Sequence, residues 1–179
     1  EDFKLIHEVS MEEHLGVNNY RDLIHELILS QVDMANSDIP LTGHFINCRG
    51  SMINWCPIGR NANNSQRAMF KVIDKSEKLR QRAIEELKEM LRQRELLNKL
   101  TIKFGGDTSF DIYPKGWDKT YGLKHFQGWN VWFVGDRCCE NGNDYEIFNA
   151  CKGKSYITFG PDYTTEIIQS IIKKIRGVK

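Results

Sequence analysis

The sequence has little net charge, no long apolar run and no paired-cysteine motif, and each absence argues against a class of protein. The formal net charge is +1, whereas a surface that binds nucleic acid or an anionic membrane usually shows a clear positive excess. No stretch approaches the about 20 apolar residues of a membrane span, and the N-terminus lacks a signal-peptide pattern. We therefore expect neither nucleic acid nor a membrane as a partner.

Motifs built on cysteine, histidine and glycine are missing as well. The five cysteines form no C-x-x-C pair and their number is odd, which disfavours a disulfide framework and a zinc site and favours reduced thiols in the cytoplasm. The five histidines have no ligand-like spacing. There is no phosphate-cradling glycine loop of Walker type and no nucleophile elbow.

What is present is an apolar fraction of 40%, enough for a hydrophobic core in 179 residues. Apolar residues recur with a 3.6-residue period after Asn19, which predicts a helix capped by Asn19 that ends before Pro40. Two short extended runs, 43–48 and 52–56, follow with a turn at Gly50. They predict an antiparallel hairpin.

A second helix and a second hairpin are predicted further along the chain. Asp74 and Glu77 resemble a capping box, and they precede a helix with an apolar face over 79–91. The runs 101–104 and 108–113 are strand-like and are separated by two glycines. This order of elements predicts an antiparallel sheet with helices on one side.

The last third of the chain has a different pattern. The run 131–134 is continuously apolar, as in a parallel strand buried on both faces, and 156–159 predicts another short strand. We expect a final helix that is capped by Asp162 and ends at Gly177. Five isoleucines should face inward from it: Ile167, Ile168, Ile171, Ile172 and Ile175.

Three arginines, Arg49, Arg60 and Arg67, lie in or just after the first predicted hairpin, in a stretch without acidic residues. The planar guanidinium suits phosphate oxygens, and a phosphomonoester carries roughly −1.5 to −2 charges near neutrality. Arginines at this spacing are more often ordinary surface residues, so spacing alone leaves both interpretations open.

Ser109 and Asp111 are two residues apart on a predicted strand, so both side chains should point to one face of the sheet. A hydroxyl and a carboxylate there can bind sugar hydroxyls. The two residues are also compatible with a plain solvent-facing strand, and the pattern by itself is weak.

Asp136 is the sharpest candidate that the residues alone provide. It follows Gly135 directly after the apolar run, at the carboxyl end of the strand, where open α/β sheets bind ligands. Asn143 and Asp144 follow in a loop with glycine, so the three residues offer oxygen ligands to a hard cation such as Mg²⁺. A polar loop with helix-capping residues is the alternative, and the two are evenly weighted.

These pieces occur together, in the same order, in one family. The stretches are Phe45-Ile46-Asn47-Cys48-Arg49-Gly50, Pro57-Ile58-Gly59-Arg60, Gln66-Arg67, Gly105-Gly106 with Ser109-Phe110-Asp111, Pro114-Lys115-Gly116-Trp117-Asp118-Lys119 and Gly142-Asn143-Asp144-Tyr145-Glu146-Ile147-Phe148. They resemble the eukaryotic-type phosphomannomutases of the haloacid dehalogenase superfamily. The resemblance extends from about residue 15 to residue 161.

The resemblance implies an α/β fold of haloacid-dehalogenase-like type. Residues 1–113 would form an α+β cap with an antiparallel sheet and helices, and 114–179 would form the C-terminal half of a Rossmann-like parallel-sheet core. We expect the domain boundary close to Tyr113. The family also implies a homodimer through the cap.

The implied activity is interconversion of mannose 6-phosphate and mannose 1-phosphate for GDP-mannose biosynthesis, with Mg²⁺ and a hexose 1,6-bisphosphate intermediate. The family assigns phosphate binding to three arginines, sugar binding to two residues, phosphoaspartate stabilisation to a lysine, and metal binding to oxygen ligands. In this sequence these are Arg49, Arg60 and Arg67; Ser109 and Asp111; Lys119; and Asp136 with Asn143, Asp144 and the carbonyl of Phe148. Preference for mannose or glucose phosphates is left open.

The sequence departs from the family pattern in three places. The family's nucleophile lies in an N-terminal Asp-x-Asp-x-Thr motif, and no Asp-x-Asp occurs here. The loop after Asp136 contains two cysteines where the family has a threonine and paired glycines. Ala150 and Gly153 replace an acidic residue and a threonine of a second cation site, of which only the carbonyl of Phe148 is expected to remain.

We therefore expect this chain alone to be inactive, because nothing else in it forms the covalent intermediate. We expect the missing segment upstream in the natural protein or as a separate chain, and an exposed apolar sheet edge that favours aggregation. Two other functions stay open. One is a sugar-phosphate phosphatase, which needs no second-phosphate clamp, and the other is a non-catalytic sugar-phosphate-binding protein.

Overall fold

The computed structural model describes residues 4–5, 7–140 and 142–177. The chain divides into two compact units, Glu1–Lys115 and Gly116–Lys179, which we call the first and the second unit. Together they contain helices, one antiparallel sheet and one parallel strand pair, so the fold is mixed α/β.

The first unit contains a four-stranded antiparallel sheet with strand order β1-β2-β4-β3. The strands are β1 (Ile46–Cys48), β2 (Ile53–Trp55), β3 (Leu100–Gly105) and β4 (Ser109–Pro114). Both predicted hairpins are confirmed. Gly50 adopts a φ of 74° at the first turn, a conformation that glycine reaches without steric cost.

Alternating residues give this sheet one apolar and one polar face. Ile53 and Trp55 of β2 and Phe110 and Ile112 of β4 are completely buried, and the rings of Trp55 and Phe110 stack with centroids 4.6 Å apart. Because side chains alternate along a strand, the residues between them point to the opposite face. That face carries the polar residues of the candidate site.

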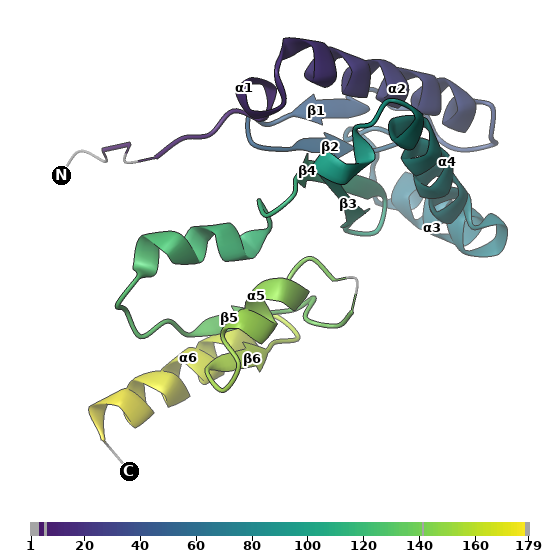
Figure 1. The fold of residues 1–179 in the computed structure, drawn as a ribbon. Coiled ribbons are helices and arrows are strands. Elements are labelled where there is room, and N and C mark those ends of the chain that lie inside the picture. Colours follow the sequence, from purple (N-terminus) through teal and green to yellow (C-terminus); the bar gives the residue numbers. More distant parts are fainter. Residues whose placement is uncertain (1–3, 6, 141, 178–179) are drawn as a thin grey trace. The chain divides into compact units, whose positions relative to one another are not determined.

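In its described residues the first unit has the α-helices α1 (Met11–Leu15), α2 (Val17–Ala35), α3 (Asn64–Glu77) and α4 (Leu79–Gln93). A short 3₁₀ helix, η1 (Leu97–Lys99), leads into β3. α2 and α4 pack against each other beside the sheet (Figure 1). Gln31 of α2 accepts a hydrogen bond from Trp55, and Arg80 of α4 lies over the ring of Phe104, so both helices cover the apolar face, as predicted.

Two predicted caps are wrong. α2 begins at Val17 after Gly16, and Asn19 lies inside the helix, where its side chain donates to the Leu15 carbonyl. Asp74 lies near the end of α3, a helix that the apolar pattern did not predict because Phe70 is its only buried residue. The actual capping box lies at the start of α3 and is formed by the N-cap Asn63 and by Gln66 in the first turn.

Asp74 nevertheless holds the start of α4. Its carboxylate accepts from the backbone N–H of Arg80 at 2.8 Å and from Arg80 Nε at 2.7 Å. Arg80 Nη1 also donates to the Gly106 carbonyl at 3.1 Å. The helix junction is therefore tied to the turn between β3 and β4.

The described part of the second unit contains a two-stranded parallel sheet and helical segments. In chain order its elements are the 3₁₀ helix η2 (Lys119–Phe126), β5 (Phe133–Gly135), α5 (Tyr145–Ala150), β6 (Ser155–Ile157) and α6 (Pro161–Arg176). The parallel pairing of β5 with β6 agrees with the parallel strand that the apolar run predicted. The strand expected at 131–134 is shifted to 133–135 and is only partly buried, because β6 is its one strand neighbour in the described residues.

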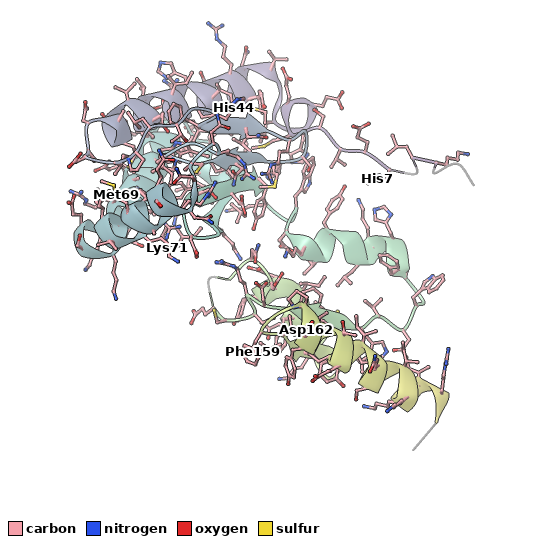
Figure 2. All side chains as sticks on the ribbon, turned by 180° about the vertical axis from the view of Figure 1, so that it is seen from behind. His7, His44, Met69, Lys71, Phe159 and Asp162 are labelled. Carbon is pink, nitrogen blue, oxygen red and sulfur yellow. The ribbon has the colours of Figure 1, made fainter. Side chains whose placement is uncertain are left out.

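The predicted inward face of α6 is partly wrong. Ile167 and Ile171 are buried, whereas Ile168, Ile172 and Ile175 are exposed, the last by 61%. The N-cap is Gly160 and Asp162 lies in the first turn, while Gly177 ends the helix as predicted. Figure 2 shows Phe159 close to Asp162 at this end of α6, and the Phe159 side chain is 87% exposed. An apolar stripe was therefore identified correctly, but only part of it is covered.

In the parts of the chain that the structure describes, no helix is both long and apolar enough to cross a membrane.

Candidate functional site

The polar face of the first unit brings three predicted residues together around one that was not predicted. Asn54 of β2 lies opposite Asp111 of β4 in the sheet register, and Ser109 is the next residue of β4 on the same face. Asn54 Nδ2 donates to Ser109 Oγ at 3.1 Å and to Asp111 Oδ1 at 2.8 Å. Asn54 Oδ1 accepts from Arg60 Nη1 at 2.9 Å.

The predicted sugar-binding pair differs in exposure. Ser109 is buried and its hydroxyl donates to the Gly105 carbonyl, so this side chain is used within the sheet. Asp111 is half-buried, and its carboxylate lies beside Gly105. A Cβ at Gly105 would lie 2.7 Å from Asp111 Oδ1, so the absence of a side chain there makes room for the carboxylate.

The structure brings two of the three predicted arginines together. Arg67 of α3 donates through Nε to the Ala62 carbonyl at 2.9 Å and through Nη2 to the Arg60 carbonyl at 3.1 Å. Its Nη1 donates to Thr108 Oγ1 at 3.1 Å. Arg67 thus fixes the loop that carries Arg60, and the exposed guanidinium of Arg60 is anchored by Asn54.

Arg49 lies in the turn between β1 and β2. Its backbone N–H donates to the Met52 carbonyl at 2.8 Å, and the residue is exposed. It is on the same unit as the other two arginines, at the end of the edge strand β1.

Sequence reasoning missed three residues of this site: Asn54, Gly105 and Thr108. The signal for Asn54 was present, because an amide between Ile53 and Trp55 interrupts an apolar run in a strand. Its role depends on register, however, and register could not be deduced from the strand alone. Gly105 was identified as part of the turn between two strands and of the family pattern, but not as the neighbour of the Asp111 carboxylate.

In the second unit, Lys119 and Asp144 form the centre of the site. Asp144 is 2% exposed, and one of its oxygens accepts from Lys119 Nζ. The other oxygen accepts from the backbone N–H groups of Asp136 at 3.2 Å and Arg137 at 3.1 Å. Burial raises the pKa of Asp144, but the hydrogen bonds from Lys119 and the two N–H groups outweigh it, so the pKa lies below its ordinary value.

Asp144 therefore has a different role from the other predicted metal ligands. Its carboxylate is already satisfied and holds the loop after β5, whereas Asp136 is exposed. Asn143 Oδ1 is buried and has no hydrogen-bond partner among the described atoms. Phe148 lies in α5, and its backbone N–H donates to the Asp144 carbonyl. Asn141, within the same loop, lies outside the described residues.

The donor types fit Mg²⁺ in part. A free carboxylate on Asp136 and an unsatisfied amide oxygen on Asn143 are hard oxygen ligands of the kind that Mg²⁺ prefers. No group of three or more His, Cys, Asp or Glu residues suited to a metal occurs within 4–5, 7–140 and 142–177. A cation here would therefore keep several waters, as Mg²⁺ commonly does.

A hollow of about 700 Å³ lies at the carboxyl ends of β5 and β6. Lys119, Asp136 and Asp144 contribute its charged groups, and the segment 158–161 closes another side. Ligands of open α/β sheets bind at this end of the strands. A cation, an exposed carboxylate and a hollow together suit an anionic ligand that is bound with a metal ion.

The comparisons with known proteins agree with one family. The family model for eukaryotic phosphomannomutase matches residues 1–174. The phosphomannomutase of Arabidopsis thaliana is 39% identical over 157 residues, which is 87% of this chain and 61% of that protein. Those of Encephalitozoon cuniculi (strain GB-M1) and Solanum lycopersicum are 38% and 36% identical, over 79% and 91% of this chain.

The chain spans 56% to 63% of the length of these three relatives. The matched region includes the first unit, the second unit as far as residue 174, and every residue of the two polar clusters described above. The chain belongs to the eukaryotic phosphomannomutase family.

Proposed function

We propose that the protein interconverts mannose 6-phosphate and mannose 1-phosphate, the activity for which its relatives are named. The observation that supports this most directly is the cluster of Arg60, Asn54 and Asp111, in which one amide is hydrogen-bonded to a cation at one end and to a carboxylate at the other. A phosphate would bind to the guanidinium of Arg60, and sugar hydroxyls would donate hydrogen bonds to the carboxylate of Asp111. A hexose phosphate presents both.

In the first unit, Arg60 and Arg49 would bind the phosphate that is not reacting, with Arg67 supporting their loop. Asp111 would accept hydrogen bonds from sugar hydroxyls, and Ser109 would hold the sheet edge beside it. A hexose 1,6-bisphosphate carries roughly −3 to −4 charges, so it requires cations for each phosphate. The arginines of the first unit would supply these cations for one of the two phosphates.

In the second unit, we propose that Lys119 neutralises charge on the phosphoryl group that is transferred. Asp136, with Asn143 beside it in the loop, would hold Mg²⁺, and Asp144 would orient Lys119 and the loop. The metal ion supplies further charge neutralisation, which is the main requirement of phosphoryl transfer. The carbonyl of Phe148 remains a candidate ligand for a second cation.

The finer fold assignment belongs to the same proposal. The antiparallel sheet with its helices would be the cap of a haloacid-dehalogenase-like enzyme, and the parallel pair would be half of its Rossmann-like core. A homodimer through the cap, a hexose 1,6-bisphosphate activator and a cytoplasmic location would follow.

A binding experiment tests the first part of the proposal. We expect mannose 6-phosphate, titrated into the chain, to shift the amide resonances of residues around Asp111 and the side-chain resonance of Arg60. Replacing Asp111 by Asn should weaken binding roughly tenfold to 100-fold, as expected for loss of a charge-assisted hydrogen bond. Asp107→Asn is the matched control, because Asp107 is an exposed carboxylate of the same hairpin that pairs with Lys71.

A turnover experiment tests the reaction class. The polypeptide isolated from its natural source should convert mannose 1-phosphate to mannose 6-phosphate when Mg²⁺ and hexose 1,6-bisphosphate are present. Release of inorganic phosphate without any need for the bisphosphate would favour the phosphatase instead. Binding of the sugar phosphate with no turnover of any kind would favour a binding protein and would contradict the proposal.

A further inference from the structure

Asn54 is a neutral amide buried between the charged groups of the site in the first unit. It lies on β2, an interior strand of the sheet, and is 3% exposed. A buried amide needs hydrogen-bond partners for its donors and its acceptor. Its partners come from β4 and from Arg60, the elements to which the proposed function assigns the ligand.

The hydrogen bonds of Asn54 are directional. The Nδ2 end faces three acceptors, which are Ser109 Oγ, the Phe110 carbonyl at 3.2 Å and Asp111 Oδ1. The Oδ1 end faces a donor, Arg60 Nη1. A reversed amide would place an NH₂ group against the guanidinium and an oxygen against the carboxylate. The network therefore fixes the amide orientation, and the carboxamide offers a donor to the anion and an acceptor to the cation without a charge of its own.

We propose that Asn54 is a positioning residue that keeps Arg60 and Asp111 apart and available for the ligand. The inference rests on the proposed function, because it assigns these two groups to a sugar phosphate. Asn54 contacts Arg60 at 2.9 Å and Asp111 at 2.8 Å from opposite ends of one carboxamide. Each charge is hydrogen-bonded in this way but is not neutralised.

We call Asn54 in this role a spacer. The alternative is a direct ion pair between Arg60 and Asp111. A guanidinium and a carboxylate form strong bidentate pairs, and attraction between opposite charges increases where water is partly excluded. If the amide were removed, Arg60 would turn to Asp111 and each group would satisfy the other. A phosphate would then have to compete with Asp111 for Arg60, and a sugar hydroxyl would have to compete with Arg60 for Asp111.

This competition predicts that a second substitution restores the phosphate affinity that the first one lowers. Inorganic phosphate is titrated into the chain and into its Asn54→Ala, Asp111→Ala and double variants, and binding is followed by the Nε resonance of Arg60. We expect Asn54→Ala to weaken phosphate binding about tenfold. Adding Asp111→Ala to it should restore affinity to within about threefold of the unchanged chain, because the competing carboxylate is gone.

A purely structural role for Asn54 predicts the reverse. The double variant would then carry two defects in one sheet and would bind phosphate no better than the Asn54→Ala variant. That result would overturn the proposal. The matched control is Asn47→Ala, which removes the amide directly across from Asn54 on the edge strand β1. Phosphate affinity should stay within about twofold in this control.

Asn54→Asp supplies a second variant if Asn54→Ala does not fold. It keeps the shape of the side chain but adds a charge, so the introduced carboxylate should itself pair with Arg60. We expect phosphate binding to fall about tenfold and Asp111→Ala to give no recovery in this background. Binding equal to that of the unchanged chain would show that neutrality at this position is unimportant and would overturn the proposal.

The ligand-free chain separates this inference from the proposed function. Asp111→Ala should shift the Arg60 Nε resonance strongly in the Asn54→Ala background and only slightly when Asn54 is present. Equal shifts in the two backgrounds would refute the spacer even if sugar phosphates bind. Failure of the unchanged chain to bind phosphate, with the unequal shifts still present, would refute the proposed function and leave the spacer standing.

Discussion

Gly105 is predicted to accept a side chain only at a cost in stability, because the Asp111 carboxylate occupies the space that a side chain would need. A Cβ built at Gly105 lies 2.7 Å from Asp111 Oδ1, 2.8 Å from its Cγ and 3.0 Å from Oδ2. Asp111 has a short side chain on an interior strand and is held by Asn54, so it cannot simply rotate away. Gly105→Ala should therefore displace the carboxylate from its hydrogen bond.

The magnitude has two opposing parts. Overpacking in a well-packed region costs about 1–3 kcal/mol, and loss of the hydrogen bond between Asn54 and Asp111 adds about 1 kcal/mol or more. Replacing glycine by alanine where φ is ordinary recovers about 0.4–1 kcal/mol through the unfolded chain. The net expectation is that Gly105→Ala lowers the free energy of unfolding of the first unit by about 1–3 kcal/mol.

Urea titration measures this in the first unit alone. The indole N–H of Trp55 donates to Gln31 at 2.8 Å, so its resonance reports folding of this unit. Gly106 is the control, since a Cβ there would meet no atom within 4 Å but its φ is +65°. Gly106→Asn should be nearly neutral because Asn accepts this φ, and Gly105→Asn should be worse than Gly105→Ala. Equal effects at the two glycines would refute the reasoning.

Three further predictions concern the second unit. Because the folded pKa of Asp144 lies below its ordinary value of 3.8, its stabilising contribution is present above that pH and is lost as the pH falls below it. Acid unfolding followed by circular dichroism should show this, and Asp144→Asn should remove the dependence. Ile172→Lys should reduce self-association in light scattering because Ile172 is exposed, whereas Ile171→Lys should unfold the unit because Ile171 is buried. Mn²⁺, used as a paramagnetic substitute for Mg²⁺, should broaden resonances of the loop after β5, and Asp136→Asn, unlike the control Glu140→Gln, should abolish the broadening.

Much of the fold was accessible from the sequence because apolar periodicity follows burial. Short extended runs separated by glycine turns predicted both hairpins, and the spacing from Leu79 to Leu91 predicted α4. α3 was missed for the same reason, because a helix with Phe70 as its only buried residue has no apolar stripe. The inward face of α6 was overestimated because periodicity identifies a stripe but not what covers it.

The charged members of the site were also accessible, since Arg60, Asp111 and Asp136 belong to residue types with known ligand chemistry. Asn54 was not, because its importance arises from register, which brings β2 opposite Asp111, and from a loop that returns Arg60 to the same face. A neutral amide between two apolar residues gives little indication of either contact. Tertiary placement, more than residue type, makes it part of the site.

The two units share a feature that bears on how their substitutions should combine. In each, a buried polar residue organises more exposed ones: Asn54 holds Arg60 and Asp111, and Asp144 holds Lys119 and the backbone of Asp136. Substituting an exposed residue removes one interaction, whereas substituting the buried one disturbs two groups at once. A buried residue substituted together with one of its own partners should therefore give a strongly non-additive change in stability, whereas substitutions at exposed residues that share no partner should be additive.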